Sequence, residues 1–155
     1  MLIAAVKLLH VLAATFFFGG GLLIAWHKLR ADRTGDPKIV AWAQREIVWA
    51  DAVFTIPAGI LLPITGVWLV ATYHLPWTTG WVPWGIGTYV VTGLLWLPAA
   101  FLQVKMRRLA EDALAGGTAL PEAFHRANRW WMLLGVPAFA LAIFTVWLMV
   151  SNWSP

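Results

Sequence analysis

The chain has 155 residues, of which 61% are hydrophobic and only 12% are charged, and it contains 12 tryptophans. A soluble domain carries about 25% charged residues, so this composition excludes a water-soluble globule and is typical of a bundle solvated by lipid. The lack of cysteine excludes disulfides, thiolate metal sites and cysteine-based catalysis, and the net charge of +4 does not indicate nucleic-acid binding, because the basic residues lie between hydrophobic segments as topology signals do.

Four apolar segments follow one another along the chain, at residues 2–26, 47–73, 84–104 and 130–150. Each is near or above the roughly 20 residues that a helix needs to cross a bilayer. Backbone groups in lipid must be hydrogen-bonded internally, so each segment is predicted to be a helix. The first is too long for a signal peptide and precedes its basic residues, so it is expected to stay as a transmembrane helix. The predicted fold is all-α, a polytopic four-helix transmembrane bundle forming a single domain over residues 1–155.

The segments that connect the spans differ in charge. Residues 28–45 and 105–129 carry every Lys and Arg of the chain except Lys7, whereas residues 74–83 carry none. The positive-inside rule places the two basic connections in the cytoplasm. Both termini and the connection 74–83 are then expected on the outside, which is the periplasm in a bacterium. The expected localisation is multi-pass in the bacterial inner (cytoplasmic) membrane.

Both basic connections are expected to be partly helical. Residues 38–45 extend the second span inward and residues 122–129 extend the fourth. Proline near a first helical turn marks the start of each extension. The expected starts are Asp36-Pro37 and Leu120-Pro121, and the expected flexible break is 115–118.

His10 is expected about two turns into the first span, with Lys7 one turn away on the same side. An ionisable group inside a span is costly to bury and is therefore a functional hypothesis by default. The imidazole can ligate a metal or haem iron, relay a proton, or hydrogen-bond a neighbouring carbonyl. Lys7 can pair with a haem propionate or extend its ammonium to the interface. The residues alone leave these alternatives open.

Two further polar side chains lie within the spans. Asp51 is near the inner end of the second span and shares a helical stripe with Thr55, Ala58, Leu62 and Thr65. It can form an ion pair with Arg45 or Arg129, or it can face a proton path or a quinone. Gln103 ends a polar stripe of the third span, which can either hold helices together by hydrogen bonds or line a pocket.

Prolines and small residues interrupt the apolar spans. Pro57 and Pro63 either only shape the second helix or open space in it for a cofactor or a path. The run Gly19-Gly20-Gly21 lies in a helix with no preceding strand, so close helix packing is expected there rather than phosphate binding.

The remaining candidates for ligands lie at membrane edges. His74 and Met149 are expected on the same side of the membrane as His10, which makes each a candidate second ligand. No other histidine is expected at the depth of His10, so a haem with two histidine ligands does not follow from the residues. His27 and His125 are expected to be solvated residues at the membrane interface.

A family resemblance adds to these observations. The run Lys7-Leu-Leu-His10-Val-Leu-Ala-Ala, followed by the three glycines, resembles the first helix of copper-resistance-D-like membrane proteins and of HemJ-type protoporphyrinogen oxidases. A fuller resemblance is to a bacterial family of predicted integral membrane proteins of unknown function. It is carried by residues 50–66, 96–107 and 129–139 together with the first helix, so it covers all four spans.

The resemblance implies a four-helix unit in which His10 matches a histidine associated with haem b. The leading hypothesis is therefore a haem-b-binding protein that passes electrons between quinol and an acceptor outside. His10 would be the metal ligand, Lys7 a propionate partner and Trp96 part of the haem wall. Besides lipid, the expected partners are a quinone, a second copy of the chain or a membrane redox partner.

Three alternatives to this hypothesis remain open. They are a cofactor-free transporter, a copper-permeation module and a structural subunit of a membrane complex. Copper sites favour Met, His and Cys ligands, and the chain has no cysteine and no methionine cluster. The rest of the HemJ pattern is missing, so porphyrinogen oxidation is not implied.

Overall fold

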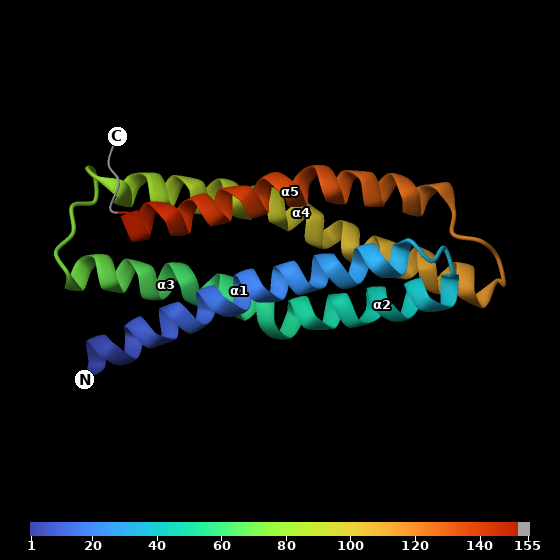
Figure 1. The fold of residues 1–155 in the computed structure, drawn as a ribbon, viewed down its shortest axis with the longest axis horizontal. Helices are drawn as coiled ribbons and strands as arrows, with labels where there is room; N and C mark the ends of the chain where they lie inside the picture. Colours follow the sequence, from blue (N-terminus) through green and yellow to red (C-terminus); the bar gives the residue numbers. More distant parts are fainter. Residues whose placement is uncertain (152–155) are drawn as a thin grey trace.

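Four long helical segments make up the protein, whose computed structural model describes residues 1–151. They are α1 (Leu2–Asp32), a composite of α2 (Pro37–Ala50), η1 (Asp51–Thr55) and α3 (Ile56–Thr72), then α4 (Trp81–Ala115) and α5 (Glu122–Ser151) (Figure 1). Each of the four is long and apolar enough to cross a membrane. The all-helical fold with four spans is thus confirmed. Pro155, the expected end of the domain, lies outside the described residues.

The helices continue well beyond the apolar segments, so the expected boundaries of the basic connections are wrong. α1 runs to Asp32, and α4 runs through the basic stretch as far as Ala115. With 35 residues, α4 is about 52 Å long at 1.5 Å per residue, against a hydrocarbon core of about 30 Å. Hydropathy marks the part of a helix that contacts lipid, whereas the backbone hydrogen bonds of the same helix continue into water.

The helical extensions of the second and fourth spans are confirmed. The Asp36 carboxylate accepts the backbone N–H of Lys38 at 2.8 Å, and Pro37 occupies the first turn, where its missing N–H costs no hydrogen bond. α4 stops before Gly117, whose φ of 62° is easily adopted only by glycine. The break expected at residues 115–118 therefore lies where the chain reverses.

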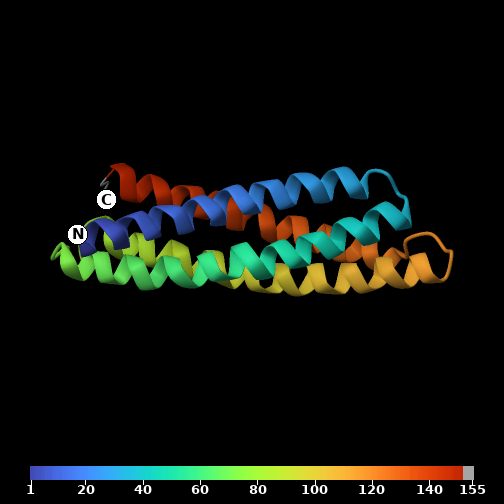
Figure 2. The same ribbon diagram turned by 90° about the horizontal axis from the view of Figure 1, so that it is seen from below.

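The two ends of the bundle differ in charge. Figures 1 and 2 show the start of α1, the α3–α4 connection and the end of α5 at one end, and the other two connections at the opposite end. We call the first the aromatic end, because Trp77 and Trp81 lie there, and the second the basic end. All Lys and Arg residues other than Lys7 belong to the half of the bundle at the basic end.

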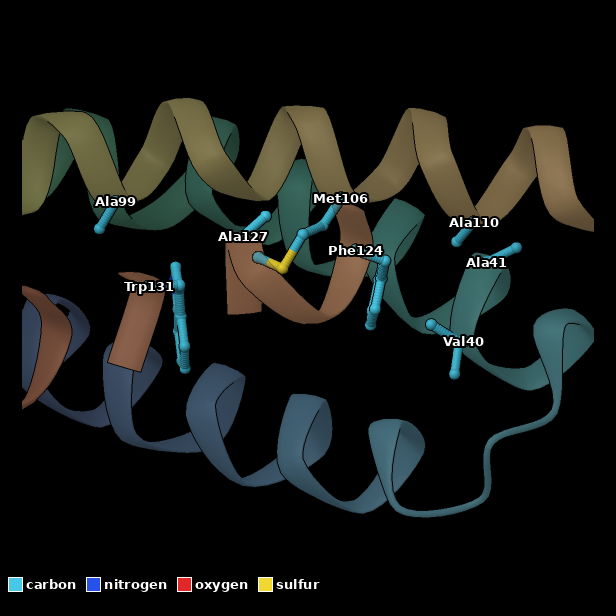
Figure 3. Close-up of a cluster of buried hydrophobic side chains, with 8 residues drawn as sticks. All are labelled: Val40, Ala41, Ala99, Met106, Ala110, Phe124, Ala127 and Trp131. Carbon is cyan, nitrogen blue, oxygen red and sulfur yellow. The ribbon is translucent and has the colours of Figure 1, made fainter. Parts of the chain in front are cut away.

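Close packing is concentrated towards the basic end. A buried cluster joins α2, α4 and α5, and Figure 3 shows the side chain of Met106 of α4 reaching towards Ala127 of α5. Its members are Val40, Ala41, Ala99, Met106, Ala110, Phe124, Ala127 and Trp131. Towards the aromatic end α1 packs on α3, and α4 packs on α5. The bundle therefore consists of two helix pairs that are joined at the basic end.

The glycine run of α1 does not pack closely on another helix. A Cβ built on Gly19, Gly20 or Gly21 meets no other atom within 4 Å. The close helix packing expected at this run is therefore wrong within residues 1–151. α1 approaches α3 through other residues, since Gly59 lies against the ring of Phe17 at 3.5 Å from its built Cβ.

The two prolines of the composite helix alter its hydrogen bonding in different ways. η1 has the wider π-helical turn, in which Ile56 donates its N–H to the carbonyl of Asp51, directly before Pro57. Pro63 has no N–H to donate to the carbonyl of Gly59, four residues earlier. The hydroxyl of Tyr89 on α4 donates to that carbonyl instead. One proline thus provides a hydrogen-bonding site that holds α4 against α3.

Candidate functional site

A cavity of about 520 Å³ lies between the two helix pairs towards the aromatic end. Its walls come from α1, α3, α4, α5 and the α3–α4 connection, and they are almost wholly apolar or aromatic. The polar or ionisable side chains that line it are Lys7, His10, Tyr73, Tyr89, Thr92 and Thr145. Sites for small molecules and cofactors are typically apolar clefts of about 300–1,000 Å³ with a few placed polar groups. We call this space the outer cavity.

His10 is held in the wall of the outer cavity by a two-step hydrogen-bond chain. Its Nδ1 lies 2.7 Å from the hydroxyl of Thr65, and that hydroxyl lies 2.6 Å from the carbonyl of Leu61. A carbonyl only accepts, so the single hydroxyl proton goes to Leu61, and Nδ1–H of His10 donates to the hydroxyl oxygen. The neutral ring then has its lone pair on Nε2. The backbone of Leu62, next to Leu61, also interacts with the ring of His10.

The imidazole also packs closely on the backbone of α3. A Cβ built on Gly66 would lie 3.4 Å from Cε1 of His10. Gly66 thus allows the ring to approach the helix while Thr65 fixes its rotation. Thr65 and Gly66 are neighbours in the sequence, and α3 supports the histidine through both. The sequence placed Thr65 in the stripe of Asp51 and gave no signal that it contacts α1.

Three of the predicted cofactor residues line the outer cavity together. Lys7 and His10 line it from α1, and Met149 lines it from α5. His74 is outside it and is exposed, with a φ of 52°. It occupies the left-handed position that ends α3, where its own N–H and that of Leu75 bond the last free carbonyls of the helix.

Trp96 lines a different and smaller cavity of about 240 Å³ between α1, α4 and α5, which we call the inner cavity. Gln103 and Trp131 also line it, and Phe17 and Thr92 line both cavities. The sequence could not show that Trp96 and His10 line different cavities, because helix spacing does not show which neighbouring helices enclose a residue.

The polar stripe of the third span serves both of its expected roles. Thr88 lies 2.7 Å from Thr145, hydroxyl to hydroxyl, and so ties α4 to α5. Thr92 and Gln103 instead line cavities. The two alternatives for this stripe therefore apply to different residues of it.

The ion pair expected for Asp51 is wrong. Asp51 is buried and interacts with Thr55 on its own helix and with Gln103 of α4. Arg45 pairs with Glu111 at 3.2 Å, and Arg129 pairs with Glu122 at 2.9 Å. Both arginines lie nearer the basic end and have acidic partners there, half-buried Glu111 and exposed Glu122. The π-helical turn instead places Asp51 among polar side chains inside the bundle.

Lys28, expected at the start of the first basic connection, is buried in the bundle instead. Its ammonium is fully buried and lies 2.5 Å from the carboxylate of Asp32 and 2.6 Å from the side-chain oxygen of Asn128. It also lies 4.7 Å from the ring centre of Trp131 and 5.9 Å from that of Phe124. The sequence signal for this buried site was helical spacing. Asp32 lies four residues after Lys28 and Trp131 three residues after Asn128, so each pair shares a helix face.

Within residues 1–151, no group of three or more His, Cys, Asp or Glu side chains is close enough to hold a metal ion.

Comparison with known proteins identifies the family of the chain, although no curated protein and no solved structure matches it. A family profile described as predicted integral membrane protein (DUF2269) matches residues 4–152. The match includes all four membrane-capable helices, and the chain therefore belongs to this family of integral membrane proteins.

Proposed function

We propose that the protein binds haem b in the outer cavity and transfers electrons, with His10 as an axial ligand. The observation that carries the proposal is the hydrogen-bond chain from His10 through Thr65 to Leu61. Histidines that ligate metals almost always donate their other ring N–H to an oxygen, which fixes the tautomer and the ring orientation. His10 has such a partner, and His10 lines the outer cavity in which the haem would bind.

The residues present fit a porphyrin better than a free metal ion. A porphyrin supplies four nitrogen ligands of its own, so a single imidazole from the protein is enough to hold it. The outer cavity has the volume and the apolar walls that suit a large flat ring. When bound, haem b supplies one-electron redox chemistry at its iron.

The other residues of the outer cavity have roles that follow from their position. Lys7 is exposed and lies one helical turn beyond His10 towards the aromatic end, where its ammonium can pair with a propionate. Met149 lines the cavity from the opposite helix pair and is the proposed second ligand. The apolar walls keep water from the site, which is one way in which a protein sets a redox potential.

We further propose that the aromatic end faces the outside and that the protein lies in the inner membrane of a bacterium. The concentration of Lys and Arg at the basic end supports this orientation. The outer cavity would then be close to an acceptor on the periplasmic side, while a quinol would reach the bundle from the lipid.

Optical spectroscopy tests the haem proposal. Protein expressed with adequate haem supply should show a Soret band and reducible α and β bands. His10→Ala should lose the haem or change its spin state, whereas His125→Ala, at the basic end, should leave the spectrum unchanged. A colourless wild type, as expected for a cofactor-free transporter, a copper-permeation module or a structural subunit, overturns the proposal. A normal spectrum at full occupancy in His10→Ala overturns the site.

Three further variants examine the supporting residues. Thr65→Val keeps the shape of the side chain but removes the acceptor of Nδ1–H, and changes of this kind typically cost about 10–100-fold in metal affinity. Met149→Ala should change the spectrum if its sulfur is the second ligand. His74→Ala should leave the spectrum unchanged, because His74 does not line the outer cavity.

A further inference from the structure

The inner cavity is a second candidate site, separate from His10 but adjoining the outer cavity. It lies between α1, α4 and α5 and has a volume of about 240 Å³. Phe17, Trp96, Trp131 and Phe139 contribute aromatic rings to its wall. Flat rings lining a narrow space favour a flat ligand, because stacked and edge-to-face contacts then cover both of its faces.

Thr92 lines this cavity and has an unused hydroxyl. Its side chain is 4% exposed, and its oxygen has no hydrogen-bond partner among residues 1–151. Thr65 and Thr145, by contrast, donate to the carbonyls of Leu61 and Leu141, four residues earlier on their helices. A buried polar group without a partner costs free energy unless a ligand or a water satisfies it. The hydroxyl of Thr92 therefore points to a ligand that offers a hydrogen-bond acceptor.

Gln103 is the second polar group of the inner cavity. Its side chain is 4% exposed and interacts with Asp51 on η1. An amide group has two N–H donors, so Gln103 can donate one to the carboxylate of Asp51 and still offer the other to a ligand. Thr92 and Gln103 lie three turns apart on α4, so they face different parts of the cavity.

The inner cavity is accessible from lipid between α1 and α5. Leu22 of α1 and Val136 of α5 line it and are also 60% and 61% exposed on the membrane-facing surface. Gly21 and Gly135 line it as well, and a Cβ built on either meets no other atom within 4 Å. The ligand can therefore enter sideways from the bilayer without passing through water.

We propose that the inner cavity binds the ring of a membrane-soluble quinone, with the hydroxyl of Thr92 donating to one of its carbonyl oxygens. A quinone combines the flat ring, the acceptor oxygens and the lipid solubility that these observations require. The cavity is smaller than the roughly 300 Å³ at which sites for whole ligands begin. The ring therefore fits inside, and the isoprenoid tail lies between Leu22 and Val136 in the lipid.

A phospholipid headgroup does not fit this chemistry. Among residues 1–151, no Lys, Arg or His lines the inner cavity. The nearby ammonium of Lys28 is already engaged by Asp32 and Asn128. Only the role of the quinone in electron transfer rests on the proposed function; its binding does not. Phe17 and Thr92 line both cavities, so a quinol in the inner cavity would adjoin a haem in the outer cavity.

Photolabelling of the full chain in nanodiscs of phosphatidylethanolamine and phosphatidylglycerol tests the proposal. The probe is an azido-substituted short-chain ubiquinone, competed with decylubiquinone, and the labelled residues are mapped by mass spectrometry. Labelling should concentrate on α1 and α5 around the inner cavity and should be removed by the competitor. Labelling spread evenly over lipid-facing residues overturns the proposal. Equal competition by decanol, which has no ring, also overturns it and identifies a site for an acyl chain.

Two variants with matched controls sharpen the test. Gly21→Leu places a side chain in the cavity mouth, where an added Cβ meets no other atom within 4 Å. Gly19→Leu is its control, because an added Cβ is equally unhindered there but Gly19 points to another side of α1 and does not line the cavity. Competed labelling should fall at least about tenfold in Gly21→Leu, as expected for a filled pocket, and stay at the wild-type level in Gly19→Leu. Equal labelling of both variants overturns the proposal.

Thr92→Val tests the hydrogen bond itself. Loss of one hydrogen bond should weaken decylubiquinone about tenfold, while thermal stability should be unchanged or higher, because the variant removes an unsatisfied buried hydroxyl. Unchanged affinity overturns the role of Thr92. Labelling does not depend on the haem spectrum, so an absent Soret band with intact labelling refutes the haem and leaves the quinone site standing.

Discussion

The hydroxyl of Tyr89 donates a hydrogen bond to the carbonyl of Gly59, and the substitution Pro63→Ala should make that bond dispensable. Pro63 leaves that carbonyl without a helical donor, and the hydroxyl of Tyr89 supplies one from α4. In Tyr89→Phe the carbonyl loses its donor inside the bundle, where water is scarce. In Pro63→Ala the backbone N–H of residue 63 is restored and can bond the carbonyl within α3.

The stability that Tyr89→Phe should cost depends on whether the carbonyl of Gly59 has another donor. Hydrogen bonds between membrane helices are worth about 0.6 kcal/mol on average and at most about 1.7 kcal/mol. A buried carbonyl that has lost its only donor costs more than the average of this range, so Tyr89→Phe should reduce the free energy of unfolding by about 1 kcal/mol. In the Pro63→Ala background the same change should cost only a few tenths of a kcal/mol, because the carbonyl keeps its helical donor.

The assay is a double-mutant cycle in detergent micelles. The free energy of unfolding is measured for wild type, both single variants and the double variant by reversible denaturation in sodium dodecyl sulfate, followed by circular dichroism. Tyr73→Phe, at the exposed end of α3, is the control and should change little. If Tyr89→Phe costs the same in both backgrounds, the hydroxyl does not serve the carbonyl that Pro63 leaves free, and the reasoning is refuted.

The buried ammonium of Lys28 should matter more for stability than any exposed cation. Lys28→Met should lower the free energy of unfolding by about 3 kcal/mol, because it leaves the partners of a buried charge uncompensated. The exposed control Lys38→Met should change it by no more than about 0.5 kcal/mol. Similar losses for both variants in denaturation would show that the ammonium of Lys28 does not stabilise the bundle. For topology, reporters within 78–81 and after Pro155 should be external and one within 115–118 cytoplasmic. A cytoplasmic reporter after Pro155 would contradict the four-span topology.

Much of the fold follows from the sequence alone, because lipid allows so few backbone structures. The charge content and the four apolar segments predicted an all-α protein with four spans, and the structure confirms it. The helix start at Asp36-Pro37 and the break before Gly117 were also predictable, since both depend on local backbone chemistry. Helix boundaries at the basic end were not, because hydropathy falls where lipid ends while the helix continues into water.

The composition of each site was decided by tertiary structure. Helical spacing placed His10 with Lys7, but only the packing of α1 on α3 brought Thr65 to its Nδ1. His74, at the left-handed residue that ends α3, lies outside the outer cavity although its neighbours Tyr73 and Leu75 line it. These outcomes depend on the rotation of each helix about its axis and on its neighbours. Sequence periodicity shows which residues share a face, but the face that meets another helix is fixed only when the side chains of all four helices pack together.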